Sequence, residues 1–108
     1  MPVSQPPVPA KLVEKLQRYP ELIDRLQDVL NDVEAKPPSI IPRFERAVDA
    51  LEGRLDSFMV EARGELERMR ASADPGLVAA AESKFRLISQ IGLKQFWIGD
   101  EALWQYFK

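Results

Sequence analysis

The sequence predicts an all-α protein: an antiparallel up-down-up three-helix bundle at about residues 10–35, 42–71 and 75–98, with a short C-terminal helix at 101–107. Three observations lead to this prediction. Apolar residues recur at alternating spacings of three and four along the first two long segments, which gathers them on one helix face. Proline-containing stretches separate the segments. The links are short, and short links make successive helices antiparallel neighbours.

The first helix, residues 10–35, is predicted to follow a proline-rich tail at residues 1–9. Pro20 interrupts it, because a proline inside a helix lacks the amide hydrogen and clashes with the carbonyl of Leu16. The apolar stripe keeps its register across Pro20, which favours one helix kinked at that position. In the alternative, Pro20 is the first residue of a second helix. The stripe consists of Leu12, Leu16, Tyr19, Ile23, Leu26, Leu30 and Val33.

The tail is predicted to be extended or mobile, since it carries four prolines. Its end, PPVPAK at Pro6–Lys11, matches the P-x-x-P-x-K pattern of segments that dock on SH3-type grooves. That pattern is short and arises by chance, so a plain N-terminal tail is favoured.

The second helix is predicted to have Ser39 as its N-cap and Pro42 in its first turn. Its spacing is coiled-coil-like. With Val48 and Leu55 at heptad a positions, however, the e and g positions carry no complementary charges for a parallel dimer. An intramolecular bundle is therefore favoured over an intermolecular coiled coil. The stripe is Phe44, Val48, Leu51, Leu55, Phe58, Ala62, Leu66 and Met69.

The third helix is predicted to begin with Asp74 as N-cap and Pro75 at the first helical position. Gly92 should weaken or bend it. Gly99 suits a left-handed C-terminal cap, and Asp100 suits the N-cap of the short last helix.

Composition restricts the function more than any motif does. The chain has 108 residues, so residues 10–108 are predicted to form one helical domain. It contains no Cys and no His, which excludes disulfides, thiolate metal sites and Ser-His-Asp chemistry. We expect no enzyme, no cofactor and no metal.

The net charge of −2 makes nucleic-acid binding unlikely. No signal peptide or membrane span is visible, which favours the cytoplasm, and the Ala- and Arg-rich composition suggests a bacterial source.

Two rows of acidic residues are candidates for partner binding. Members of each row are three or four positions apart, where like charges repel weakly on a helix. The first row, with Glu21 before it, is Asp24, Asp28 and Asp32; the second is Glu45, Asp49, Glu52 and Asp56. Such rows can dock a basic partner or weakly bind a hard divalent cation. An ordinary solvated helix face is the competing and favoured interpretation.

The C-terminal stretch LKQFWIGDEALWQYFK holds most of the aromatic residues. Leu103 and Phe107 are one helical turn apart, so they can dock the last helix on the bundle. Trp97, Trp104 and Tyr106 are the candidate contacts with a partner, since Trp and Tyr dominate interface hot spots. For Trp104 and Tyr106, burial within the same chain is the competing and favoured interpretation, and contact with a membrane is the least favoured one.

The sequence thus predicts a non-catalytic helical protein–protein interaction module: a small adaptor, inhibitor or regulator. Its partner would be another protein or a second copy in a homodimer. The alternative is a helical regulator that acts on nucleic acid directly or through a partner. Arg63, Arg68 and Arg70 would then contribute, but the interleaved Glu65 and Glu67 cancel much of their field.

Overall fold

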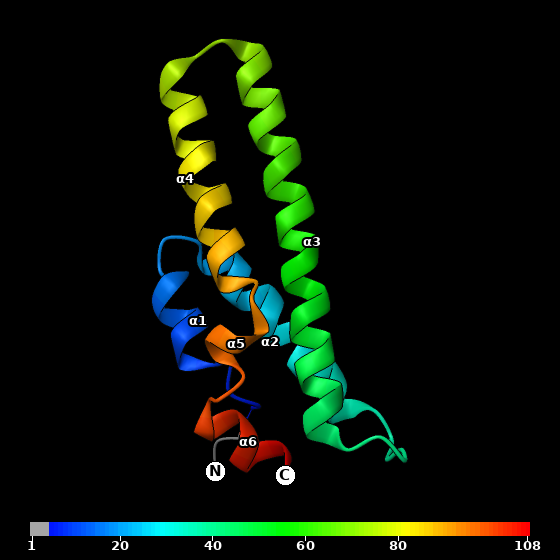
Figure 1. Ribbon diagram of the computed structural model, residues 1–108. Coiled ribbons are helices and arrows are strands. Elements are labelled where there is room, and N and C mark those ends of the chain that lie inside the picture. Colours follow the sequence, from blue (N-terminus) through cyan, green and yellow to red (C-terminus); the bar gives the residue numbers. More distant parts are fainter. Residues whose placement is uncertain (1–4) are drawn as a thin grey trace.

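The computed structural model describes residues 5–108, which form six α-helices joined by short links (Figure 1). They are α1 (Ala10–Lys15), α2 (Pro20–Ala35), α3 (Arg43–Ser72), α4 (Pro75–Ile91), α5 (Lys94–Trp97) and α6 (Glu101–Phe107). These described residues contain no strand, so the all-α prediction is confirmed. The long helices α2, α3 and α4 pack against each other. Because α2 crosses the α3–α4 pair, the exact up-down-up bundle that was predicted is not confirmed.

Figure 1 shows α3 and α4 side by side as an antiparallel hairpin, with α2 crossing behind its lower half. The helices α1, α5 and α6 gather at the lower end, as does the C-terminus. Ion pairs show the direction of α2: Arg25 lies opposite Glu61, and Glu34 lies opposite Arg43. α2 is therefore antiparallel to α3 and covers its N-terminal half and middle.

The core is built on the apolar stripe of α3. The observed bounds of this helix agree with the predicted residues 42–71 to within one residue at each end. Phe44 and Met69, near the two ends of the predicted stripe, are half-buried. The stripe residues between them are buried: Val48, Leu51, Leu55, Phe58, Ala62 and Leu66.

A tight turn reverses the chain between α3 and α4. Ala73 ends α3 in the left-handed conformation, with φ 58°. Asp74 then caps α4, because its Oδ1 accepts hydrogen bonds from the backbone N of Gly76 (3.0 Å) and of Leu77 (3.2 Å). Pro75 is the first helical residue. The N-cap predicted at Asp74 is confirmed.

The predicted kink at Pro20 is wrong, because two separate helices form there. α1 ends at Lys15, and Pro20 is the first residue of α2, where no amide hydrogen is needed. Tyr19, which precedes the proline, adopts the non-helical conformation expected there (φ −130°, ψ 65°). The stripe runs through the break because both helices bury a face: Leu12 and Leu16 are in the same core as Leu22 and Leu26.

The predicted helix at 75–98 is also broken. α4 ends at Ile91, Leu93 is extended, and α5 follows as a single turn. The left-handed cap predicted at Gly99 is wrong, since no glycine in the described residues has a positive φ. The N-cap predicted at Asp100 is confirmed: Oδ1 accepts from Leu103 N at 2.8 Å, while Oδ2 accepts from Ala10 N at 2.9 Å. One carboxylate thus joins the first turns of α6 and α1.

The segment before α1 packs on the helices. Pro6 and Pro9 are buried, and Gln27 Nε2 donates a hydrogen bond to the carbonyl of Pro6 at 2.7 Å. The prolines of the P-x-x-P pattern are therefore not available to an SH3-type groove. The remainder of the predicted tail, residues 1–4, lies outside the described residues.

We predict that Leu55→Ala lowers the free energy of unfolding by about 2–5 kcal/mol, because the buried side chain leaves a cavity in the core. Val60 on the same helix is 72% exposed and provides the control. Val60→Ala should change stability by less than about 0.5 kcal/mol. Urea unfolding followed by circular dichroism measures both, and similar losses for the two variants would contradict this core.

For Pro20→Ala we expect a loss of about 0.4–1 kcal/mol, because proline fits the first helical position and restricts the unfolded chain. Thermal unfolding of wild type and variant measures the difference. A gain in stability would show that Pro20 strains a continuous helix, contrary to the structure.

Candidate functional site

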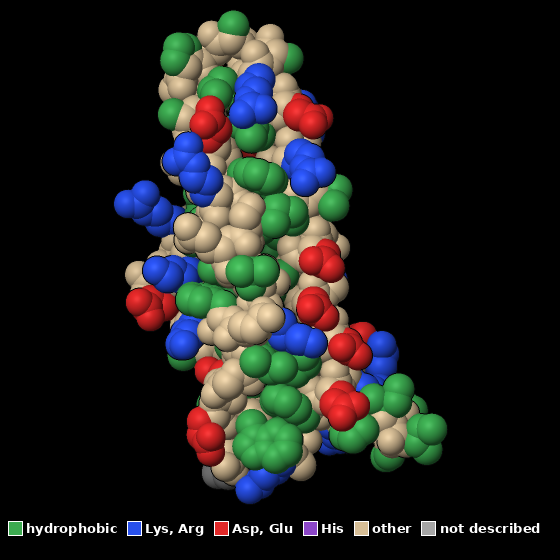
Figure 2. Space-filling model, in the orientation of Figure 1, with side chains coloured by type: hydrophobic (Ala, Val, Ile, Leu, Met, Phe, Trp, Pro, Cys, Tyr) green, Lys and Arg blue, Asp and Glu red, His purple; other side chains and the backbone are tan. Residues whose placement is uncertain are grey.

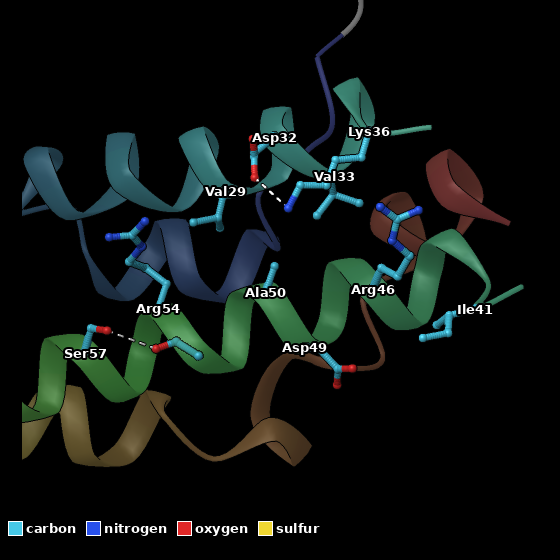
Figure 3. A pocket seen from close by; sticks show the side chains of 11 residues that line it. Val29, Asp32, Val33, Lys36, Ile41, Arg46, Asp49, Ala50, Arg54 and Ser57 are labelled. Carbon is cyan, nitrogen blue, oxygen red and sulfur yellow. Dashed lines mark hydrogen bonds and ion pairs between the residues drawn. The ribbon is translucent and has the colours of Figure 1, made fainter. Parts of the chain in front are cut away.

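A groove runs along the surface between α2 and α3 (Figure 3). Val29 and Val33 of α2 and Ala50 and Gly53 of α3 supply small or apolar lining, and the groove has a volume of about 480 Å³. The groove is open because Ala50 and Gly53 carry little or no side chain. A Cβ atom added at Gly53 would meet nothing within 4 Å. We call it the α2–α3 groove. The other residues that line it are Asp32, Lys36, Ile41, Arg46, Asp49, Arg54 and Ser57.

The link between α2 and α3 exposes two isoleucines at one end of this groove. Ile40 is fully exposed (101%) and Ile41 is 50% exposed. Figure 2 shows apolar side chains projecting at the lower right, where Figure 1 places this link. Its backbone is held, because Arg46 Nη1 donates to the carbonyl of Pro37 at 3.1 Å and Ser39 Oγ accepts from Ile41 N at 3.1 Å. The predicted N-cap at Ser39 is wrong, since Pro42 occupies that position.

The sequence predicted neither isoleucine as a site residue. Two adjacent β-branched residues after a Pro-Pro pair in an inter-helix link were the available signal, because a link has no core to bury them. The groove left no such signal, since it depends on how two helices cross.

Each of the two acidic rows predicted from the sequence contributes one residue to the lining of the α2–α3 groove. Asp32 of the first row and Asp49 of the second both line it. Asp24, Asp28, Glu45 and Asp56 are exposed, Glu21 is exposed beside the first row, and Glu52 is half-buried. Figure 2 shows acidic side chains gathered along the lower half of α3.

Few of these carboxylates are neutralised within residues 5–108. Asp32 pairs with Lys36 at 3.1 Å, and the other members of the two rows form no ion pair there. The described residues contain no group of three or more His, Cys, Asp or Glu side chains that could hold a metal ion. The cation-binding interpretation of the rows therefore gains no support.

The aromatic candidates occupy three different environments. Trp97 is 1% exposed in the core, and its Nε1 has no hydrogen-bond partner among the described residues. Trp104 is 45% exposed, with one edge against Phe44 of α3 (ring centroids 4.9 Å apart). Tyr106 is half-buried. Burial raises the pKa of Tyr106, and the negative charge of Glu34 adds to the rise.

The placement of α6 agrees with its predicted docking. Leu103 and Phe107 are buried, and they turn Trp104 toward the surface at the N-terminal end of α3. Trp104 is thus the one tryptophan within a partner's reach, whereas Trp97 packs inside its own chain.

A bidentate ion pair fixes α2 on α3 near the groove. Arg25 Nη1 and Nη2 donate to Glu61 Oε1 and Oε2, each at 2.7 Å, and the guanidinium lies 4.7 Å from the ring centroid of Phe58. The hydrogen bonds from Arg25 hold the pKa of Glu61 below its ordinary value, and the bonds to Glu61 raise the pKa of Arg25. These partners are 36 positions apart, so spacing could not predict them.

No protein-family model, curated protein or solved structure matches this chain. None of the helices formed by residues 5–108 combines the length and the apolar character needed to cross a membrane.

The Glu61 pKa predicts a stability change in acid. Because the folded-state pKa lies below the ordinary 4.5, the ion pair stabilises the fold at higher pH, and this contribution is lost as pH falls through the folded-state value. Glu61→Gln should lower neutral-pH stability by about 0.2–1 kcal/mol, a small effect since both side chains are partly exposed. The variant should also lose less stability between pH 5 and about pH 2 than wild type does.

Urea unfolding across this pH range measures both effects. Glu67→Gln provides the control, because Glu67 is exposed on the same helix and forms no ion pair within the described residues. Identical acid sensitivity in wild type and Glu61→Gln would contradict the role of the pair.

Proposed function

We propose that the chain is a non-catalytic helical protein–protein interaction module: a small cytoplasmic adaptor, inhibitor or regulator. The observation that carries this proposal is Ile40, a large apolar side chain that is fully exposed next to Ile41, which lines an open groove. Isolated exposed apolar residues are ordinary, but Ile41 is also exposed in the same link and Trp104 at the same end of α3. Apolar groups presented together, with charged residues around them, are typical of protein-binding surfaces.

The anchoring of the link supports this interpretation. The hydrogen bonds to the Pro37 carbonyl and the Ser39 hydroxyl hold the link that presents Ile40. A side chain held in place loses little conformational entropy on binding, and this favours affinity. Trp104 is likewise held by Phe44 and by the docked α6.

The partner is another protein or a second copy of the chain. Analytical ultracentrifugation over a concentration series separates these cases, because only self-association depends on the concentration of the chain alone. A direct nucleic-acid contact would instead show binding that falls steeply with salt.

The test compares two exposed positions of similar chemistry. Immobilised wild type, Ile40→Asp and Val60→Asp are used to capture proteins from the native host for mass spectrometry. Both variants should keep their stability to within about 0.5 kcal/mol, since both side chains are exposed. We expect Ile40→Asp to lose at least about ten-fold of the captured partner, as for an interface anchor, and Val60→Asp to retain it.

Two outcomes would contradict the proposal. One is a wild-type chain that captures no protein and stays monomeric at all concentrations. The other is equal capture by Ile40→Asp and wild type, which would remove Ile40 from the binding surface.

A further inference from the structure

We propose that the chain forms a homodimer in which the ends of two α3–α4 hairpins pack face to face and antiparallel, as a four-helix bundle. The surface is separate from Ile40, so this inference does not depend on the proposed function. Three observations carry it: a hairpin that no third helix covers at its end, bands of opposite charge across that end, and an apolar pair between the bands.

Beyond the part that α2 covers, α3 and α4 continue as a two-helix hairpin. We call residues 62–72 of α3 and 75–86 of α4 the hairpin end, and Figure 1 shows it projecting beyond the other helices. Leu66 and Ala81 are buried there, but neither belongs to the cluster that forms the main core. An apolar helix face needs a further element to bury it, and three large side chains of the hairpin end are only half-buried. They are Met69, Val78 and Phe85.

The Glu65–Lys84 ion pair fixes the height of α3 against α4 in the hairpin end. Both residues line a pocket together with Leu22, so this pair lies on the side of the hairpin that faces α2. A step of two positions along a helix turns the side chain by about 200°, and it therefore leads to the opposite face. Taken from this pair along both helices, one such step leads to Arg63 and Arg86, and the other to Glu67 and Glu82.

These four residues form two bands of opposite charge across the hairpin, which we call the basic band and the acidic band. They line one pocket together with Leu66 and Phe85, the apolar pair that lies between the bands. Every residue of this lining belongs to α3 or α4. Figure 2 shows the bands near the upper end of the hairpin: acidic side chains on both helices, and basic side chains on both helices below them. Four positions separate the bands along α3, a distance of about 6 Å.

The charge of this lining is mixed, with three arginines and two glutamates. Within the chain, Arg86 pairs with Glu82 at 3.4 Å, and the Arg63 guanidinium lies 6.0 Å from the ring centroid of Phe85. The ion pair lies at the surface and therefore contributes little. The third arginine, Arg70, lies beyond the acidic band. A uniformly acidic or uniformly basic partner would match one band and oppose the other.

A second copy matches both bands. A two-fold axis that crosses the hairpin between the bands places α3 of one copy on α3 of the other in the opposite direction. Arg63 then faces Glu67 of the partner subunit, and Arg86 faces Glu82 of the partner subunit. The apolar pair meets its own copy at the axis, where each pair covers the other. A parallel arrangement would instead place each band on its own copy, and like charges in an interface cost affinity.

The antiparallel dimer leaves the surface of the proposed function free. Ile40 lies in the link at the N-terminal end of α3, whereas the hairpin end contains its C-terminal end. Overlap of the two hairpin ends therefore directs the two Ile40 links away from each other. The dimer presents two partner surfaces, and two linked sites raise the avidity for a partner that can engage both.

Charge-reversal variants test the pairing of the bands. Arg63→Glu with Arg86→Glu makes both bands acidic, and Glu67→Arg with Glu82→Arg makes both basic. Circular dichroism should show both variants folded, since none of the four residues is buried. Sedimentation velocity over a concentration series should show that each variant dimerises at least about ten-fold more weakly than wild type. An equimolar mixture should form a heterodimer with an affinity within about three-fold of wild type, because every band again faces its opposite.

Lys15→Glu with Arg18→Glu is the matched control. It changes the net charge as the all-acidic variant does, but at exposed residues in α1 and the link after it. We expect this control to dimerise as wild type does. Mixed with the all-basic variant, it should associate about ten-fold more weakly than the all-acidic variant does, because only one of its bands is complementary. Equal association in the two mixtures would overturn the proposal, since net charge alone would then explain it.

Two further results would overturn the hairpin interface. One is a wild-type chain that stays monomeric up to about 1 mM. The other is loss of the dimer in Ile40→Asp, which would place self-association at the Ile40 surface. Capture from the native host keeps the two proposals distinct. Capture that requires Ile40, by a chain that stays monomeric, would leave the proposed function standing without the dimer. Dimerisation that requires the bands, with equal capture by Ile40→Asp and wild type, would leave the dimer standing without the Ile40 surface.

Discussion

The fold depends on the apolar stripe of α3, because this stripe is the surface on which both of the other long helices pack. Each of those two helices covers only part of it. α3 has 30 residues and is therefore about 45 Å long, close to the 49 Å longest dimension of the molecule. α2 and α4 have 16 and 17 residues, so neither can cover the stripe alone. Hydrogen bonds and ion pairs between the helices show which part of α3 each one covers. α4 lies beside Met59 and Glu65, whereas α2 reaches from Arg43 to Glu61. The stagger leaves the N-terminal half of α3 without cover from α4.

The short helices complete the core where α4 ends. α1 and α5 pack on each other and on α4, and α6 packs on α3. Trp97, Leu103 and Phe107 join Leu12 and Leu16 in a single cluster with the stripe of α3. A helix of four to seven residues is not stable alone, so these pieces depend on docking and on their caps. The Asp100 carboxylate, shared between α6 and α1, therefore joins elements that are 90 positions apart.

Sequence reasoning found the features that depend on local chemistry. The stripe of α3 and the caps at Asp74 and Asp100 follow from spacing and from side chains that bond their own turn. It failed at Pro20, because an unbroken stripe is compatible both with one kinked helix and with two helices that bury the same face. The environments of Trp97 and Trp104 also lay beyond it: Gly92 was predicted to weaken or bend one helix, whereas α4 ends at Ile91 and Trp97 lies in the separate helix α5. The groove and the Arg25–Glu61 pair arise only when distant helices cross.

Stability does not account for the surface at the base of α3. Burial of an isoleucine side chain stabilises a fold by about 1.5–3 kcal/mol, yet Ile40 is fully exposed. Like charges three or four positions apart cost a few tenths of a kcal/mol per pair, yet both acidic rows keep this spacing, and each contributes one residue, Asp32 or Asp49, to the groove. Gly53 is less favourable in a helix interior than alanine by about 1 kcal/mol, and its Cβ would have had room. Folding stability alone therefore does not explain these three features.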